Sequence, residues 1–121
     1  MKGLVMKQTL IISPALTAES MGSGLLPVYA TPAVVALMEN TACLCIKDLA
    51  DEDTTVGIHI DVQHVKAAKV GEKVSCTAEL TRTEGRRYTF AIEVKNEKGE
   101  MLATATHERV RVNKSRFMEK V

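Results

Sequence analysis

The chain has 121 residues and a formal net charge of +1, and 45% of its residues are apolar, 26% charged and 3% aromatic. This length predicts one domain, residues 1–121, around a single hydrophobic core. The near-neutral charge and the scarcity of aromatic residues argue against a nucleic-acid-binding protein, which needs a basic surface and stacking side chains. No apolar run approaches the roughly 20 residues of a membrane helix. We therefore expect neither nucleic acid nor a membrane as a partner.

The first half of the chain predicts one strand and one long helix. The strand is expected over residues 7–13, and a loop rich in Ser, Thr, Pro and Gly follows over residues 13–23, with a mobile stretch at residues 21–24. Thr31 and Pro32 then mark a helix start, with Thr31 as the N-cap and Pro32 in the first helical position. This helix is expected to continue to about Leu49. It is apolar nearly all round, which is typical of a helix buried on most of its surface.

Four strands are expected after the helix, over residues 54–65, 74–83, 86–95 and 101–112. Apolar residues alternate within them, and the turns at 84–85 and 96–99 contain glycine. This order predicts an α+β fold, in which an antiparallel sheet of about five strands wraps around one long buried helix. One sheet covers only part of so apolar a helix, so we expect a homodimer or a higher homo-oligomer with packed helices.

The chain has three cysteines, Cys43, Cys45 and Cys76, an odd number that fits a reducing compartment better than a disulfide framework. Cys43 and Cys45 lie two positions apart on the expected helix, and we expect both to fill the core as free thiols. The cytoplasm is the expected location.

Glu39 stands in the most apolar stretch of the chain, residues 33–44. A carboxylate that is buried alone is costly, or it becomes neutral through a shift of its pKa. Two interpretations follow. Glu39 either belongs with Asn40 to the one exposed stripe of the helix, or it faces a cleft and serves as a base or nucleophile.

His64 ends a strand-like run in which side chains alternate between two faces. Period-two alternation places one apolar set together, Ile58, Ile60, Val62 and His64, and one polar set opposite, His59, Asp61 and Gln63. The apolar face is expected to lie toward the helix, where the imidazole would be either a catalytic group or a hydrogen-bonded structural one. A metal site would need a third ligand that we cannot place, and we expect no metal and no cofactor.

Thr31 and Gly57 are weaker candidates when each is taken alone. A hydroxyl at a helix N-terminus lies in positive potential, where negative charge can develop during a reaction. Gly57 gives either flexibility at a strand start or close approach of the backbone to a ligand. A hydroxyl, a carboxylate and an imidazole are the components of a hydrolytic site, but their pattern alone does not show that they converge.

Four segments of the chain resemble the fluoroacetyl-CoA thioesterase family, a branch of the hotdog superfamily, in the same order and spacing. The first is residues 29–39, with Ala-Thr followed by an apolar run and Leu-Met-Glu, and the second joins Gly57 to His64 seven positions later. The others are residues 77–80 with 84–87, and residues 106–109. The resemblance extends from about Val28 to the C-terminus.

This resemblance implies hydrolysis of a short-chain acyl-CoA to a carboxylate and free CoA by a dimeric hotdog enzyme. It places Thr31, Glu39 and His64 in the catalytic positions and the Gly57 N–H where the thioester oxygen is received. It also implies that Arg109 is a substrate-binding residue, on the CoA side of the site. His64 would act as the general base, and Glu39 would orient the imidazole and water or attack the carbonyl itself.

The chain departs from the family in the segment before Ala-Thr. The fluoroacetyl-specific member has a Phe-rich lid there, whereas Tyr29 is the only aromatic residue of segment 21–29 here. We therefore expect an acyl preference other than fluoroacetyl. Two alternatives stay open: a non-catalytic module that binds acyl thioesters, and a hotdog hydratase or dehydratase. The second is disfavoured because Asp61 and His64 fall on opposite strand faces.

Overall fold

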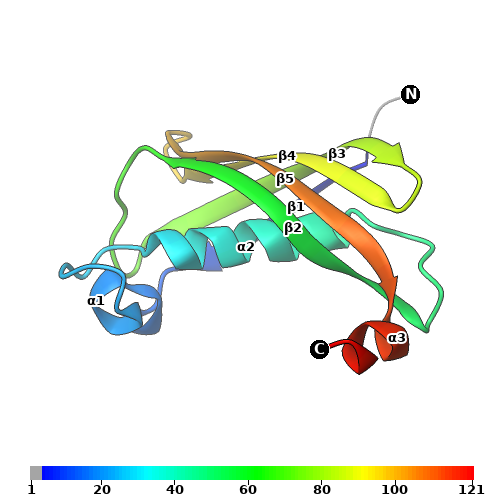
Figure 1. Ribbon diagram of the computed structural model, residues 1–121. Coiled ribbons are helices and arrows are strands. Elements are labelled where there is room, and N and C mark those ends of the chain that lie inside the picture. Colours follow the sequence, from blue (N-terminus) through cyan, green and yellow to red (C-terminus); the bar gives the residue numbers. More distant parts are fainter. Residues whose placement is uncertain (1–3) are drawn as a thin grey trace.

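A five-stranded antiparallel sheet curves around one long helix in the computed structural model, which describes residues 4–121 (Figure 1). The helix is α2 (Thr31–Leu44), and the strand order is β1-β3-β4-β5-β2. The strands are β1 (Val5–Ile11), β2 (Asp53–His64), β3 (Lys73–Glu84), β4 (Arg87–Asn96) and β5 (Met101–Asn113). This arrangement confirms the expected α+β hotdog fold.

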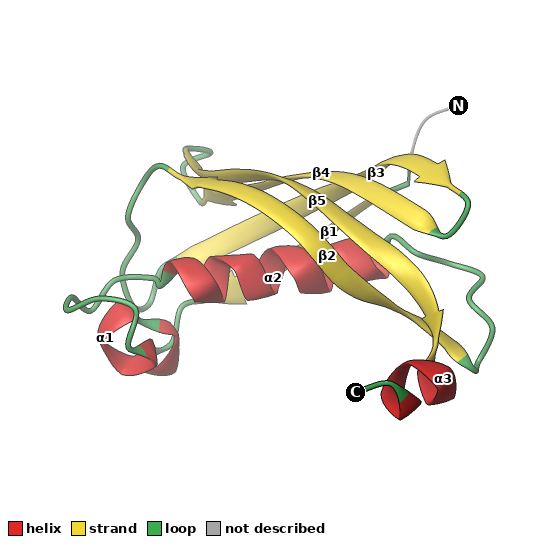
Figure 2. Ribbon diagram, viewed as in Figure 1, coloured by secondary structure: helices red, strands yellow, loops and turns green. Residues whose placement is uncertain are grey.

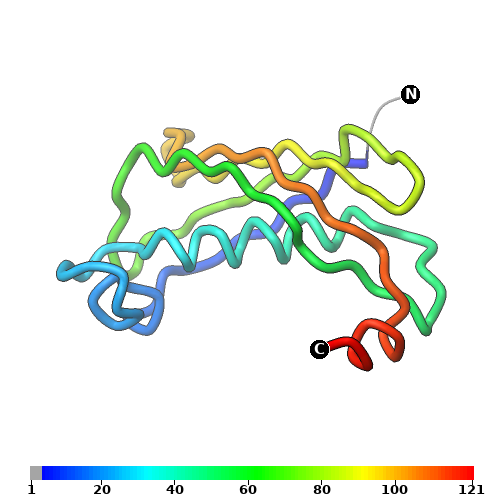
Figure 3. The backbone as a smooth tube through the Cα atoms, viewed as in Figure 1, coloured from blue at the N-terminus to red at the C-terminus, as the bar shows by residue number. Residues whose placement is uncertain are grey.

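Helix α2 connects the two edge strands of the sheet. The chain leaves β1 at one edge, runs through α2 under the concave face, and enters β2 at the opposite edge (Figures 2 and 3). Both β1 and β2 therefore have one side without a strand neighbour among residues 4–121. Among residues 4–121, no helix combines the length and the apolar character needed to cross a bilayer.

The core lies between α2 and the concave face of the sheet. The alternation expected for β3 and β4 is confirmed, because one alternating set of side chains on each strand is buried or half-buried. They are Val74, Cys76, Ala78 and Leu80 on β3, and Tyr88, Phe90, Ile92 and Val94 on β4. The glycines of the two predicted turns, Gly85 and Gly99, adopt positive φ angles of 60° and 80°, a backbone conformation that glycine adopts without strain.

Helix α2 ends at Leu44, earlier than the expected end at Leu49. Apolar residues continue beyond this point because the chain still passes over the core: Cys45 is buried and Ile46 packs against the core cluster. Asp48 has a φ of 62°, in the left-handed region that no α-helix contains. The apolar residues after Leu44 therefore reflect contact with the core and not a continuing helix.

The segment expected as a loop over residues 13–23 contains two short helices, η1 (Pro14–Leu16) and α1 (Ala18–Met21). The Thr17 hydroxyl caps α1 by accepting a hydrogen bond from the Ser20 amide at 3.3 Å. A third unexpected helix, α3 (Lys114–Glu119), begins where the Asn113 side chain accepts from the Arg116 amide at 3.0 Å. Thr and Asn are both residue types that commonly cap a helix N-terminus. The helices themselves are too short to produce a periodic pattern of apolar residues in the sequence.

Of the two cysteines expected in the core, Cys45 is buried there and Cys43 is not. Cys45 and Cys76 are buried, and burial raises the pKa of Cys76 to about 11, so its thiol is unreactive at neutral pH. Cys43 is exposed on the outer stripe of α2 that also holds Ala36 and Asn40. Its expected place in the core is wrong, because the helix is less completely covered within one chain than its sequence predicted.

Strand β2 contains a bulge next to Gly57. Its register with β5 shifts between Gly57, opposite Arg109, and His59, opposite Glu108, so β2 has one extra residue at this point. The extra residue moves Ile58 out of the helix-facing row, and its side chain is 48% exposed. The expectation that Ile58 faces the helix is therefore wrong, whereas Ile60 and Val62 do pack against the core.

Candidate active site

The Thr31 hydroxyl and the His64 imidazole meet where β2 ends beside the start of α2. Thr31 Oγ1 lies 2.7 Å from His64 Nδ1. Ala30, not Thr31, is the N-cap of α2, and within the described part of the chain no side chain caps the first turn. Thr31 instead occupies the first helical position and uses its hydroxyl to contact the ring. The pair thus lies in the positive potential of an uncapped helix N-terminus, which favours developing negative charge.

The second nitrogen of His64 is buried, and no group of residues 4–121 forms a hydrogen bond with it. The contact between Thr31 and His64 is compatible with either donor. The Thr31 hydroxyl donates if Nδ1 is bare, and it accepts if Nδ1 is protonated. For His64 to act as a base toward Thr31, Nδ1 must be bare and Nε2 protonated.

Glu39 lies near the middle of α2 and forms an ion pair with Arg109 of β5. Glu39 Oε2 lies 3.3 Å from Arg109 Nη1, and the two side chains are 41% and 10% exposed, respectively. The carboxylate is therefore neither buried alone nor fully exposed. It lies at the rim of the core with a charged partner that sequence periodicity did not identify.

The Arg109 guanidinium is fixed by β2 as well as by Glu39. Its Nε donates to Thr55 Oγ1 at 2.9 Å, and its Nη2 donates to the Thr55 carbonyl at 3.1 Å. Arg109 was expected to lie on the CoA side of the site, but its head group is directed inward to these partners. Arginine suits such a position because its planar group offers several donors in a fixed geometry.

Gly57 lies where Glu39, Arg109 and His107 converge. A β-carbon at this position would lie 2.8 Å from Glu39 Oε2, 3.3 Å from Arg109 Nη1 and 3.3 Å from His107 Cε1. Space, not backbone angle, is the requirement here, because Gly57 does not have a positive φ. The backbone approaches these side chains as closely as only glycine permits.

Sequence reasoning did not single out His107. Its ring is buried, stacks on Phe90 with 5.8 Å between centroids, and contacts Arg109 Nη1 at 3.2 Å through Nε2. A signal was available, since period-two alternation places His107 and Arg109 on the same face of one strand.

The candidate residues form two groups within one chain. Thr31 lies with His64, and Glu39 lies with Gly57, Arg109 and His107. Thr31 and Glu39 are eight residues apart on α2, or about 12 Å along its axis. Gly57 and His64 are seven positions apart on β2, or roughly 20 Å. The two groups therefore lie at separate places along α2 and β2 of one chain.

The segment before Thr31 contributes no aromatic cover to the site. Tyr29 is 1% exposed and its ring lies in the core, where burial first and Cys76 second raise its pKa to about 12. The exposed large apolar residues of segment 21–29 are instead Met21, Leu25 and Leu26, at 44%, 92% and 64%.

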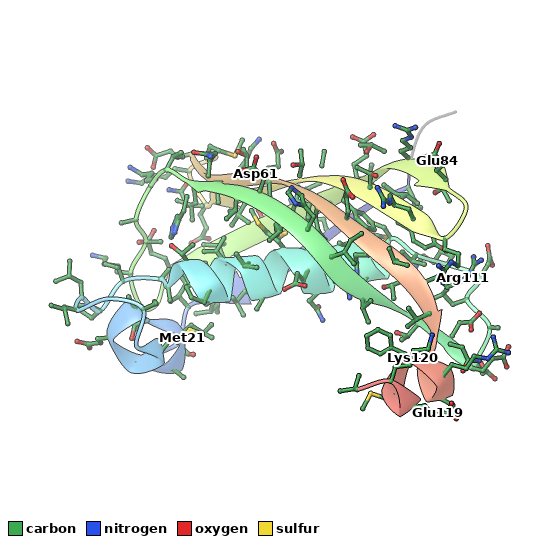
Figure 4. The ribbon with its side chains drawn as sticks, viewed as in Figure 1. Met21, Asp61, Glu84, Arg111, Glu119 and Lys120 are labelled. Atoms are coloured by element: carbon green, nitrogen blue, oxygen red, sulfur yellow. The ribbon has the colours of Figure 1, made fainter. Side chains whose placement is uncertain are left out.

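Asp61 lies on the opposite side of β2 from His64. It pairs with the exposed Thr106 on the outer face of the sheet, away from α2 (Figure 4). The Asp–His pair that a hydratase would use is therefore not formed by these two residues.

Comparisons with known proteins agree with this architecture. Residues 12–115 match the family model of the fluoroacetyl-CoA-specific thioesterase FlK. The fluoroacetyl-CoA thioesterase of Streptantibioticus cattleyicolor is 33% identical over 98 residues, which cover 78% of this chain and 68% of that protein.

Solved structures superpose closely on the chain. The structure of FlK is 26% identical with a TM-score of 0.92, covering 99% of this chain and 93% of that one. A thioesterase superfamily member from Thermus thermophilus is 26% identical with a TM-score of 0.88, covering 98% and 88%. The match to the family model spans most of the sequence, and the fold and the site segments agree with it, so this chain belongs to the fluoroacetyl-CoA thioesterase family of the hotdog superfamily.

Proposed function

We propose that this chain hydrolyses short-chain acyl-CoA thioesters to a carboxylate and free CoA in the cytoplasm. The contact between Thr31 and His64 at the uncapped N-terminus of α2 carries this proposal. A hydroxyl 2.7 Å from an imidazole is within reach for proton transfer. The Glu39 carboxylate beside Gly57 supplies the third group of a hydrolytic site.

His64 acts as the general base in the proposed reaction. Its Nδ1 takes a proton from Thr31 or from a water molecule, and the resulting oxygen nucleophile attacks the thioester carbonyl carbon. The carbonyl oxygen becomes negative and accepts a hydrogen bond from the Gly57 N–H. The carbon–sulfur bond then breaks, and the CoA thiolate takes the proton from the imidazolium. If water is the nucleophile, this step gives the carboxylate directly. If Thr31 is the nucleophile, a water that His64 deprotonates hydrolyses the resulting threonine ester, and the Thr31 oxygen recovers its proton from His64. Glu39 orients the attacking water, or attacks the carbonyl itself to form an anhydride that water then hydrolyses.

The proposed enzyme is a homodimer that joins the two groups of residues across its interface. Strand β2 is an edge strand, so it can pair with β2 of a second copy. An antiparallel pairing centred near Ile60 and Asp61 brings Gly57 of one protomer close to His64 of the partner subunit. The exposed apolar side chains of Ile58 and Val65 at this edge, and of Leu44 at the end of α2, support such contact.

The acyl group is proposed to be short and unlike fluoroacetyl. A solved FlK variant with 25% identity and a TM-score of 0.89 holds fluoroacetate and CoA, which supports CoA as the carrier here. The core position of Tyr29 leaves no aromatic side chain in segment 21–29 to cover a fluorinated group.

Release of free thiol from a panel of acyl-CoA thioesters tests the function. The panel runs from acetyl to octanoyl and includes fluoroacetyl and an aryl-acyl thioester, with the protein's own thiols counted separately. We expect turnover with a preference for one short chain length. Binding detected by thermal shift without turnover on any thioester would instead identify a non-catalytic module.

Single substitutions test the residues of the site. We expect Thr31→Ala, Glu39→Gln and His64→Ala each to lower kcat by about tenfold or more, since each removes a group that acts on the reacting atoms. Steady-state kinetics gives the rates, and circular dichroism checks that the fold is intact. Rates close to wild type in all three variants would contradict the assignment.

A further inference from the structure

His107 has hydrogen-bond partners that leave its ring only one protonation state. Nδ1 lies 2.7 Å from the His59 carbonyl oxygen, which can only accept, so Nδ1 must carry a proton. Nε2 lies 3.2 Å from Arg109 Nη1, which can only donate, so Nε2 must be bare. The imidazole is therefore neutral, with its proton on Nδ1.

The bulge of β2 supplies the carbonyl that fixes this state. His59 is the residue at which the register with β5 resumes after Gly57. Its carbonyl binds His107, while the neighbouring Gly57 gives the space in which Glu39, Arg109 and His107 meet. One local irregularity of the strand thus sets both the free space and the orientation of the ring.

Arg109 Nη1 is shared between His107 and Glu39. It lies 3.2 Å from the bare nitrogen of His107 and 3.3 Å from Glu39 Oε2. We propose that His107 is a positioning residue of the active site, which holds the Arg109 guanidinium so that the Glu39 carboxylate stays beside the Gly57 backbone. This inference rests on the proposed function, because it assigns His107 a part in the same reaction.

A protonated His107 could not perform this task. Its Nε2–H would be directed at a guanidinium that also offers only donors, and Arg109 would have to move. The charged and titratable groups that face the ring are Arg109 on its own strand, Glu39 on α2 and His59 on β2. Burial first, with help from Arg109, lowers the pKa of His107 despite the opposing His59 carbonyl and Glu39, so the ring stays neutral at physiological pH.

Nuclear magnetic resonance of the wild-type protein tests the protonation state directly. Two-bond ¹H–¹⁵N correlations of the imidazole distinguish the two neutral tautomers and the imidazolium. We expect His107 to be the Nδ1–H tautomer at pH 7 and to remain neutral near pH 6, where an unperturbed histidine is largely protonated. An Nε2–H tautomer, or an imidazolium at pH 7, would overturn the proposal.

Kinetics of two substitutions tests the positioning role. His107→Leu removes both hydrogen bonds, whereas His107→Gln keeps one donor and one acceptor. We expect His107→Leu to lower kcat by about tenfold or more with little change in KM, because the carboxylate shifts while the thioester still binds. We expect His107→Gln to recover most of the loss. An unchanged kcat in His107→Leu would contradict the role.

Val74→Ala provides a matched control, since Val74 is equally buried but lies on β3, away from the site. It is expected to lower the melting temperature and leave kcat unchanged, which separates positioning from loss of stability. If His107→Leu does not fold, the positioning role is judged from the His107 tautomer in the wild type and from the kinetics of His107→Gln. If the wild type hydrolyses no thioester, the proposed function fails, and the Arg109 Nε–H resonance then tests the network separately. If His107 holds the guanidinium, this resonance should broaden in His107→Leu and stay sharp in His107→Gln. A sharp resonance in His107→Leu would overturn the positioning role.

Discussion

Gly57→Ala is expected to lower kcat by roughly a hundredfold while changing stability little. The added β-carbon would lie 2.8 Å from Glu39 Oε2, closer than two such atoms can approach. Glu39 is 41% exposed, so its flexible end can move outward and relieve the contact without disturbing the core. The carboxylate then leaves Arg109 and its place beside the backbone, and a displacement of about 1 Å can reduce a rate by two orders of magnitude.

Gly85→Ala is the matched control for this prediction. Gly85 lies in the β3–β4 turn with a φ of 60°, and a β-carbon there would have no atom within 4 Å. Alanine in the left-handed region costs about 1–2 kcal/mol, so this variant should lose stability and keep its kcat. Thermal unfolding and thiol release measured on both variants give the two effects separately. A Gly57→Ala enzyme that retains full activity would show that the site tolerates a side chain there.

A double substitution shows whether the Gly57 effect acts through Glu39. In the Glu39→Ala background there is no carboxylate to displace, so adding Gly57→Ala should lower kcat by far less than it does in the wild type. Residues that act as a unit are strongly non-additive. Full additivity would mean that Gly57→Ala acts through another contact, such as Arg109 or His107.

The sequence predicted the fold well because its signals were periodic. Alternation of apolar residues indicated the inward rows of β3 and β4. Glycine marked the two turns that need a positive φ, and Pro32 marked the start of α2. The end of α2 and the helices α1 and α3 were missed. An apolar run that passes over the core has the same sequence pattern whether or not it is helical, which hid the end of α2. The short helices α1 and α3 have one capping residue each as their only sequence signal, which is too little to predict them.

The site was predicted only in part, since one-dimensional patterns contain no information on side-chain partners. The resemblance named Thr31, Glu39, His64, Gly57 and Arg109, but it did not indicate that they form two groups within one chain. The bulge at Gly57 was also hidden, because an extra residue in β2 is defined only by its register with β5. That irregularity explains both the misplaced Ile58 and the close approach of Gly57 to Glu39.

Mixing two inactive variants is expected to restore activity if the active site spans two protomers. His64→Ala damages only the Thr31–His64 group, and Glu39→Gln damages only the Glu39–Gly57 group. In a mixed dimer, one site combines the intact His64 of one protomer with the intact Glu39 of the partner, and the other site carries both substitutions. Each variant alone has no intact site.

The size of the recovery is fixed by symmetry. Random exchange of equal amounts gives about half mixed dimers, each with one of two sites intact, or about a quarter of the wild-type rate. The variants should be exchanged through mild denaturation and reassembly, and thiol release compared with each variant treated alone. If all catalytic groups came from one chain, every site in the mixed dimer would carry one substitution, and no recovery would occur. The separation of the two groups along α2 and β2 favours recovery of activity, because groups that lie apart within one chain can meet at one thioester carbonyl across an interface.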